Sequence, residues 1–276
     1  MIFRKGTINF SLALIGTSSL LLCILSGIPL SFHFFYSQPL VSILHIESHI
    51  PFGKFLRNLH YLSAQVSLIA MFLHLVDSIM KELYRSKTHL SWFFLTFSLF
   101  LLLFITFTGY LLRADEVGEL AGAIVENLFL SVPWLGEPMN NIFFAQSKVG
   151  LIRVYHWHLI LSFFLVMGVF IWHVKIKSIL RWDNLMYFLS LPTISLLFEF
   201  PLVPFHSIKA RGPWFFVGAQ EMLKYLDPII VLLFLMTPVF LLLSYSYLPG
   251  YTPWVNLGGL AYLALYLVVS LLFFLH

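Results

Sequence analysis

Four histidines lie inside long apolar stretches of the chain, where polar side chains are costly and usually serve a purpose. His60 and His74 are 14 residues apart, and His158 and His173 are 15 residues apart. On an α-helix both spacings are close to four turns, so each pair leaves one helix face about 21 Å apart along the axis. Two such helices can hold two flat cofactors at matched depths. Because neutral imidazole is a common axial ligand of haem iron, we interpret the pattern as a bis-histidine site for two haems.

The alternative is that these histidines are bonded to neighbouring backbone or line a proton path. For a single histidine that interpretation would be favoured, but two pairs at matched spacing make it the weaker one. His156 competes with His158 as a ligand. It lies about 4.7 turns before His173, whereas His158 lies about 4.2 turns before it, which is closer to whole turns. The spacing therefore favours His158.

Composition places the chain in a membrane. Of its 276 residues 60% are hydrophobic and only 10% are charged, which is too little charge for the surface of a soluble domain of this size. The net charge of +4 is scattered over short loops and gives no sign of nucleic-acid binding. Cys23 is the single cysteine, so the chain can form no internal disulfide, no CxxCH haem attachment and no cysteine-ligated cluster of its own.

The apolar runs predict an all-α, polytopic membrane helix bundle of about seven transmembrane helices with a four-helix di-haem core. Each run is long enough to cross about 30 Å of hydrocarbon. Pro192 and Glu199 make the fifth run the least regular. The acidic segment 113–155 contains apolar stretches, so we expect short interfacial helices there. The predicted spans are 10–33, 57–80, 91–112, 156–175, 183–200, 228–246 and 255–275.

The loops alternate in charge along the chain. Because basic loops stay cytoplasmic, we expect the N-terminus inside, the C-terminus outside and the protein in a bacterial inner membrane. The second and fourth spans then both run from outside to inside. This direction pairs His60 with His158 at an outer haem and His74 with His173 at an inner one. The basic set consists of Arg4, Lys5, Lys81, Arg85, Lys87, Lys175, Lys177 and Arg181.

Two arginines precede the outer ligands at the expected membrane surface. Arg57 lies three residues before His60, and Arg153 lies five residues before His158. A guanidinium in this place could pair with a haem propionate. The less favoured alternative is that both are ordinary interface arginines.

The motifs around the histidines resemble the cytochrome b/b6 family over residues 8–180. Arg57-Asn-Leu-His60 is similar to the start of the family's second helix, and Arg153 matches the arginine before its ligand in the fourth. The gap from His158 to His173 resembles b6, and the match also selects His158 over His156. Similarity to the family's outer loop is carried by Gly109-Tyr-Leu-Leu-Arg-Ala-Asp-Glu116, Ala123-Ile-Val125 and Pro133-Trp-Leu-Gly136.

The resemblance implies two non-covalent haems b and glycines that pack against them, at Gly27 and Gly109. Ala13 and Leu95 stand at two other glycine positions of the family, and Gly16 could compensate. It also implies a b6-like di-haem domain over 1–180, fused to a divergent three-helix part over 181–276 that resembles subunit IV of b6f complexes. Ser11 lies near the position where b6 has a cysteine that tethers an extra haem, so we expect no covalent haem c.

The expected outer quinone site departs from the family. Where the family has Pro-Glu-Trp-Tyr, this chain has Arg211-Gly-Pro213-Trp214-Phe-Phe216, which keeps the aromatic wall but lacks the glutamate. Glu221 or His206 could take its place. The family also has Pro-Trp-Asp or similar where this chain has Arg-Ala-Asp115. The candidate outer quinone pocket comprises residues near Glu116, Glu126, Pro213, Trp214 and Glu221, and a candidate inner one lies near Lys175, Asp183 and the start of the first span.

These features predict a di-haem cytochrome subunit that transfers electrons across a lipid membrane between quinol or quinone and a redox partner. The expected partners are iron–sulfur, c-type or multihaem cytochrome subunits of a larger complex, and a dimer is left open. Because the glutamate of the family's Pro-Glu-Trp-Tyr motif is missing, electron bifurcation and simple two-electron transfer are about equally compatible with this sequence. The rival interpretations are a haem-b anchor of a dehydrogenase or reductase and, in a different class, a haem transporter.

Overall fold

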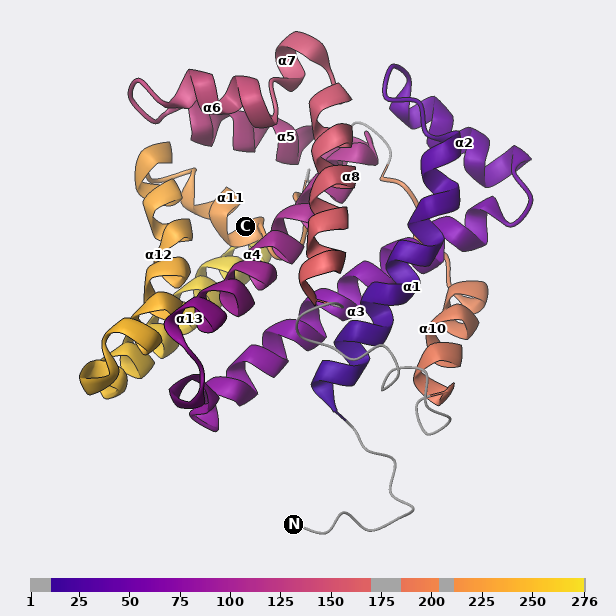
Figure 1. The fold of residues 1–276 in the computed structure, drawn as a ribbon. Helices are drawn as coiled ribbons and strands as arrows, with labels where there is room; N and C mark the ends of the chain where they lie inside the picture. The colour runs from indigo at the N-terminus through magenta and orange to yellow at the C-terminus, as the bar shows by residue number, and fades with distance from the viewer. Residues whose placement is uncertain (1–10, 170–184, 204–210, 276) are drawn as a thin grey trace.

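The computed structural model describes residues 11–169, 185–203 and 211–275, which form a bundle of helices (Figure 1). Within these ranges it contains no β-strand. The helices are α1 (Leu12–His33), α2 (Pro39–His49), α3 (Gly53–Met80), α4 (His89–Leu112), α5 (Glu116–Leu130), α6 (Gly136–Phe143), α7 (Gln146–Val149), α8 (Ile152–Val166), α10 (Leu185–Leu197), α11 (Val217–Met222), α12 (Pro228–Tyr247) and α13 (Thr252–Leu275), with 3-10 turns η1 (Leu83–Ser86) and η4 (Pro249–Tyr251).

Six of the described helices are long and apolar enough to cross a membrane: α1, α3, α4, α8, α12 and α13. They confirm the predicted polytopic helical class. The predicted span 183–200 is described only in part, because residues 183 and 184 lie outside the described residues; from Leu185 onward α10 has 13 residues. Pro192 lies inside α10, and the helix ends at Leu197.

Local sequence signals set several helix starts. The side chain of Thr88 accepts a hydrogen bond from the backbone N–H of Ser91 at the start of α4, and Asp115 does the same for Gly118 at the start of α5. Such N-caps satisfy backbone donors that the helix itself leaves open. Proline occupies the beginning of α2 and α12, where its missing N–H costs nothing.

Pairs of long helices frame the bundle. In Figure 1, α1 packs along α3 and α4 packs along α8, while α12 and α13 lie beside each other and α12 also contacts α4. The short helices α5, α6 and α7 lie across one end of the bundle, which we call the α5–α7 end. They confirm that segment 113–155 forms short helices instead of a free loop.

Three apolar clusters lie between the N-terminal helices and their neighbours in the described part of the chain, and a fourth joins the C-terminal helices to the rest. One cluster lies at the α5–α7 end around Leu111 and Phe144, and another lies deeper around Leu68 and Leu102. In the fourth, the indole N–H of Trp92 donates to the carbonyl of Leu242 at 2.7 Å. The C-terminal helices therefore pack onto α4 through specific contacts.

Candidate functional site

His60 on α3 and His158 on α8 face each other near the α5–α7 end of the bundle. Their ring centres are 6.3 Å apart, and the ring planes are inclined by 67°. The two residues are 98 positions apart in the sequence, so this pairing is a product of the fold. The structure thus brings together the two side chains that the spacing assigned to the outer haem.

Each imidazole is anchored through Nδ1 to the backbone of a facing helix. Nδ1 of His60 lies 2.8 Å from the carbonyl oxygen of Cys23 on α1. Nδ1 of His158 lies 3.1 Å from the carbonyl oxygen of Ile105 and 2.9 Å from the hydroxyl of Thr108, both on α4. A carbonyl can only accept, so each Nδ1 carries the proton and each Nε2 keeps its lone pair. That tautomer is the one that ligates a metal through Nε2.

The separation of the two rings fits one metal ion between them. Two metal–nitrogen bonds of about 2 Å, with roughly 1 Å from each nitrogen to its ring centre, give about 6 Å between ring centres. The observed value is 6.3 Å. Among the described residues neither Nε2 has a hydrogen-bond partner. The pair therefore has the spacing and the donor atoms of a bis-imidazole haem site.

Glycines make room for these imidazoles. A Cβ added at Gly27 on α1 would lie 2.9 Å from Cε1 of His60, and one added at Gly109 on α4 would lie 3.3 Å from Cε1 of His158. The two positions that the family resemblance marked as haem-packing glycines thus contact the ligand rings. A side chain at either position would press on an imidazole that its Nδ1 contact holds in place.

The two arginines differ in their surroundings. Arg57 forms an ion pair with Glu47 and donates to the carbonyl of Phe200. Nη1 of Arg153 and Nε of Arg57 are both buried without a hydrogen bond in the described part of the chain, but Nε of Arg57 is the atom that is ion-paired with Glu47. A buried guanidinium nitrogen without an acceptor is costly, and a carboxylate would satisfy it. Arg153 therefore fits a propionate partner better than Arg57 does.

The inner site is described on one side only. His74 is a partly buried residue on α3, and its backbone carbonyl accepts from the hydroxyl of Ser78 at 2.7 Å. His173, Lys175 and Asp183 lie outside the described residues. The pairing of His74 with His173 and the inner quinone pocket therefore remain predictions.

His156 does not compete for the outer site. It is exposed, and its Nδ1 lies 2.7 Å from the carbonyl of Ile152 in its own helix. Its ring lies 6.2 Å from that of Tyr36, far from the geometry of a second ligand to His60. The structure therefore places the ring of His158, and not that of His156, opposite His60.

The corner at residues 211–216 is tied to α3 and α4 by Trp214 together with Gln65, Tyr61 and Tyr110, to which the sequence analysis gave no role. The indole N–H of Trp214 donates to Oε1 of Gln65 on α3 at 2.8 Å, and the hydroxyl of Tyr110 donates to the same atom at 3.4 Å. Tyr61, next to His60, shares a 2.9 Å hydrogen bond with Tyr110. The guanidinium of Arg113 lies 5.5 Å from the centres of both tyrosine rings. Polar residues inside a predicted span, such as Gln65, were the signal for this network.

The three carboxylates predicted for the outer quinone pocket lie in different surroundings. Glu116 is partly buried in the first turn of α5, and its backbone N–H donates to the carbonyl of Val203 at 3.4 Å. Glu126 is buried and accepts from the side chain of Asn140 and the backbone of Ser147, both at 3.2 Å. Glu221 lines a cavity between α11, α12 and α13. His206 lies outside the described residues.

The long apolar helices and the facing imidazoles define the class, an integral membrane helix bundle with two imidazoles facing each other between its helices. The chain matches the family model described as cytochrome b/b6/petB over residues 5–180 and belongs to that family. Its fold is similar to a chain of a solved "Hyperthermophilic respiratory Complex III", with a TM-score of 0.66 and 17% identity, covering 99% of this chain and 89% of that chain. The protein is thus a membrane cytochrome b, an electron-transfer subunit of the kind that binds non-covalent haem b.

Proposed function

We propose that the protein transfers electrons across the membrane through two haems b, between quinol or quinone and a redox partner. The observation that carries this proposal is the His60–His158 pair, with ring centres 6.3 Å apart and both Nδ1 atoms held by backbone carbonyls. His60 and His158 would hold one haem, and His74 and His173 the other. When bound, haem supplies reversible one-electron transfer.

The residues around the outer pair have defined tasks in this proposal. The carbonyls of Cys23 and Ile105 fix the tautomer of each ligand and raise its basicity, which favours a firmly held, oxidised iron. Thr108 adds a second contact to His158 at 2.9 Å. With both imidazoles as ligands, His60 and His158 would hold a haem that carries electrons without binding oxygen.

The outer quinone pocket is best placed at the corner of residues 211–216. Trp214 and Phe215 supply aromatic surface there, and Tyr110 contacts the Phe215 ring at 5.8 Å between ring centres. Gln65 presents a carbonyl oxygen that accepts from Trp214. Quinone chemistry couples electrons to protons, so an ionisable group is expected at the ring edge. Glu116, which follows α4 and contacts Val203, is the candidate in this neighbourhood.

The similar solved structure is a chain of a respiratory Complex III, which supports placing this protein in a multisubunit respiratory complex. Iron–sulfur or c-type cytochrome subunits would then accept electrons at the outer face. We place the complex in a bacterial cytoplasmic membrane with the N-terminus inside. The rival is a haem-b anchor of a dehydrogenase or reductase, without quinol oxidation at the outer corner.

Stopped-flow spectroscopy of the isolated complex tests the proposal. We expect short-chain quinols to reduce the b haems, and a ring-analogue inhibitor of the outer corner to slow one phase of that reduction. If both haems are present and no quinol reduces them, the proposal is wrong. Reduction that is insensitive to every outer-site inhibitor would instead support the anchor.

A further inference from the structure

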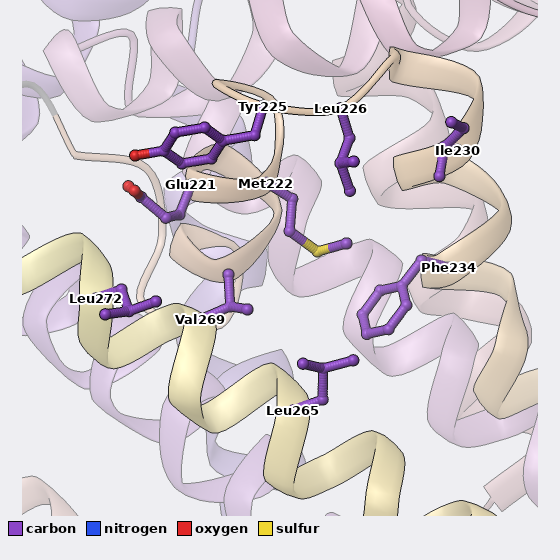
Figure 2. A pocket seen from close by; sticks show the side chains of 9 residues that line it. All are labelled: Glu221, Met222, Tyr225, Leu226, Ile230, Phe234, Leu265, Val269 and Leu272. Atoms are coloured by element: carbon purple, nitrogen blue, oxygen red, sulfur yellow. The ribbon is translucent and has the colours of Figure 1, made fainter.

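Two places away from the outer histidine pair differ in what they offer a ligand. The first is a cavity of about 400 Å³ between α11, α12 and α13 (Figure 2). It exposes no polar surface, and the carboxylate that borders it, Glu221, is buried and ion-paired with Lys224. The second place is the outward side of α2, where two imidazoles lie next to each other. Only the second place presents donor atoms to a ligand.

The short helix α2 has one buried side and one exposed side. It lies at the edge of the bundle, beside the end of α1, and contacts the beginning of α3 (Figure 1). Ser42, Ile43 and Ile46 are its buried residues, whereas His45 and His49 are exposed. Because the two histidines are four positions apart, their side chains leave the same face of the helix. Ions in solution can therefore reach both imidazoles.

The separation of the two rings fits neighbouring positions around one metal ion. The ring centres of His45 and His49 are 4.9 Å apart, and the ring planes are inclined by 17°. A metal–nitrogen bond of about 2.1 Å places a ring centre about 3.2 Å from the ion, so this separation corresponds to an angle of about 100° at the ion. That angle lies between those of an octahedral site (about 90°) and a tetrahedral one (about 109°). Both side chains are exposed, so the rings can turn toward a common ion without movement of the helix.

His49 is held in the tautomer that binds metals. The hydroxyl of Ser48 donates its single proton to the carbonyl of Leu44 at 2.6 Å. Oγ of Ser48 can then only accept in its 2.7 Å contact with Nδ1 of His49. Nδ1 therefore carries the proton and Nε2 keeps its lone pair, and a partner on the second nitrogen is what orients metal-binding imidazoles. Within the described ranges no hydrogen bond engages the ring of His45.

We propose that His45 and His49 bind a divalent transition-metal ion, with the imidazoles at neighbouring positions and water at the others. Imidazole nitrogen suits zinc and copper. The described residues bring no third protein ligand to the place, so the site is open and its ion exchangeable. The ion cross-links the last turn of α2, whose Glu47 pairs with Arg57 near the beginning of α3. This site is independent of the proposed quinone chemistry.

Isothermal titration of the purified, oxidised complex with Zn²⁺ tests the site. We expect His45→Ala and His49→Ala each to weaken one zinc site about a hundredfold, because two linked contacts bind much more tightly than one. The matched control is His156→Ala, since His156 is also exposed but has no second histidine three or four positions away. This variant should bind zinc as the unaltered complex does. Unchanged haem content in each variant verifies folding.

Two further measurements report the ligands themselves. Electron paramagnetic resonance with Cu²⁺ as the probe should show splitting from two nitrogens in the unaltered complex and from one in either variant. Ser48→Ala keeps both donors and should weaken zinc binding less than tenfold, because water can replace the hydroxyl at the exposed Nδ1. Zinc should also slow hydrogen exchange in α2, a helix of only 11 residues, and should not do so in His45→Ala.

Three results would overturn the proposal. The first is unchanged zinc affinity in both His45→Ala and His49→Ala. The second is an equal loss in His156→Ala, which would mean that exposed histidines bind zinc one at a time. The third is a Cu²⁺ spectrum with a single nitrogen, together with lower thermal stability of the two variants. That outcome would assign the imidazoles to the C-terminus of α2, where positive charge offsets the helix dipole.

Discussion

The histidine pair joins α3 to α8, and the corner at residues 211–216 packs against α3 and α4, yet the two sites depend on different kinds of information. The pair needs two imidazoles at a set distance, two backbone carbonyls and two small residues. The corner needs loops and side chains from several elements to meet, and Trp214 reaches Gln65 across 149 positions. Residue spacing in the sequence can predict a site that is built on regular helices, but it cannot predict one that is built on loops.

Removing one outer ligand should produce the largest effect. His158→Ala should reduce the haem content from two to one per chain, because the remaining imidazole cannot hold the iron from both sides. Pyridine haemochrome analysis measures the change. His156→Ala is the control and should keep both haems, since His156 is exposed and bonds its own helix. If His156→Ala lost a haem and His158→Ala kept both, His156 would be the ligand instead of His158.

Crowding the imidazoles should have the next largest effect. Gly27→Ala places a Cβ 2.9 Å from Cε1 of His60, and Gly109→Ala places one 3.3 Å from Cε1 of His158. Overpacking costs about 1–3 kcal/mol, so we expect Gly27→Ala to lose roughly tenfold in haem affinity. Gly109→Ala should lose less. Haem-transfer titrations to apomyoglobin would measure both affinities. Equal losses of haem affinity in the two variants would show that the distance from the added Cβ to the imidazole does not determine the loss.

Loosening the corner should change quinol reactivity without changing the haems. Gln65→Leu removes the acceptor for Trp214 and for Tyr110. A lost hydrogen bond of about 1 kcal/mol predicts a roughly fivefold slower quinol-dependent reduction. The low-spin haem spectrum should stay as in the unaltered protein. A shifted spectrum with normal quinol reduction would place Gln65 at the haem instead of at the corner.

Neutralising Arg153 should have the smallest effect. Arg153→Gln removes a cation near the outer haem, which stabilises the oxidised state and lowers the midpoint potential. For about 1 kcal/mol in a one-electron couple the shift is about 40 mV downward. Redox titration of the two b haems measures it. Arg85→Gln at the opposite end of the bundle, where Arg85 pairs with Glu82 at 3.0 Å, should leave the potential of the outer haem unchanged.

The sequence predicted the helices well, and it predicted that His60 and His158 would face each other, because both follow from periodicity. Runs of apolar residues set the spans, and whole-turn spacing selected His60 and His158. The glycines were implied by family resemblance, and the structure adds that they contact the imidazoles themselves. The boundary near residue 180 stays a prediction.

Other parts depended on contacts that no spacing reveals. Arg57 could pair with a haem propionate, as far as its position in the sequence goes. The structure adds an ion pair between Arg57 and Glu47 of α2, which no sequence pattern indicated. Glu221 was grouped with Trp214 by sequence proximity. The turns of α11 instead place its carboxylate beside Lys224 and α13, whereas Trp214 contacts α3. Short helices between loops rotate neighbouring side chains into different surroundings.

The most direct test of the account is the haem content of the unaltered protein. Acid–acetone extraction with pyridine haemochrome analysis of the purified chain should yield two haems b per polypeptide, all extractable, with a bis-imidazole low-spin spectrum. That result follows if His60 with His158 and His74 with His173 each ligate one iron. Zero or one haem per chain, or haem that resists extraction, would contradict it.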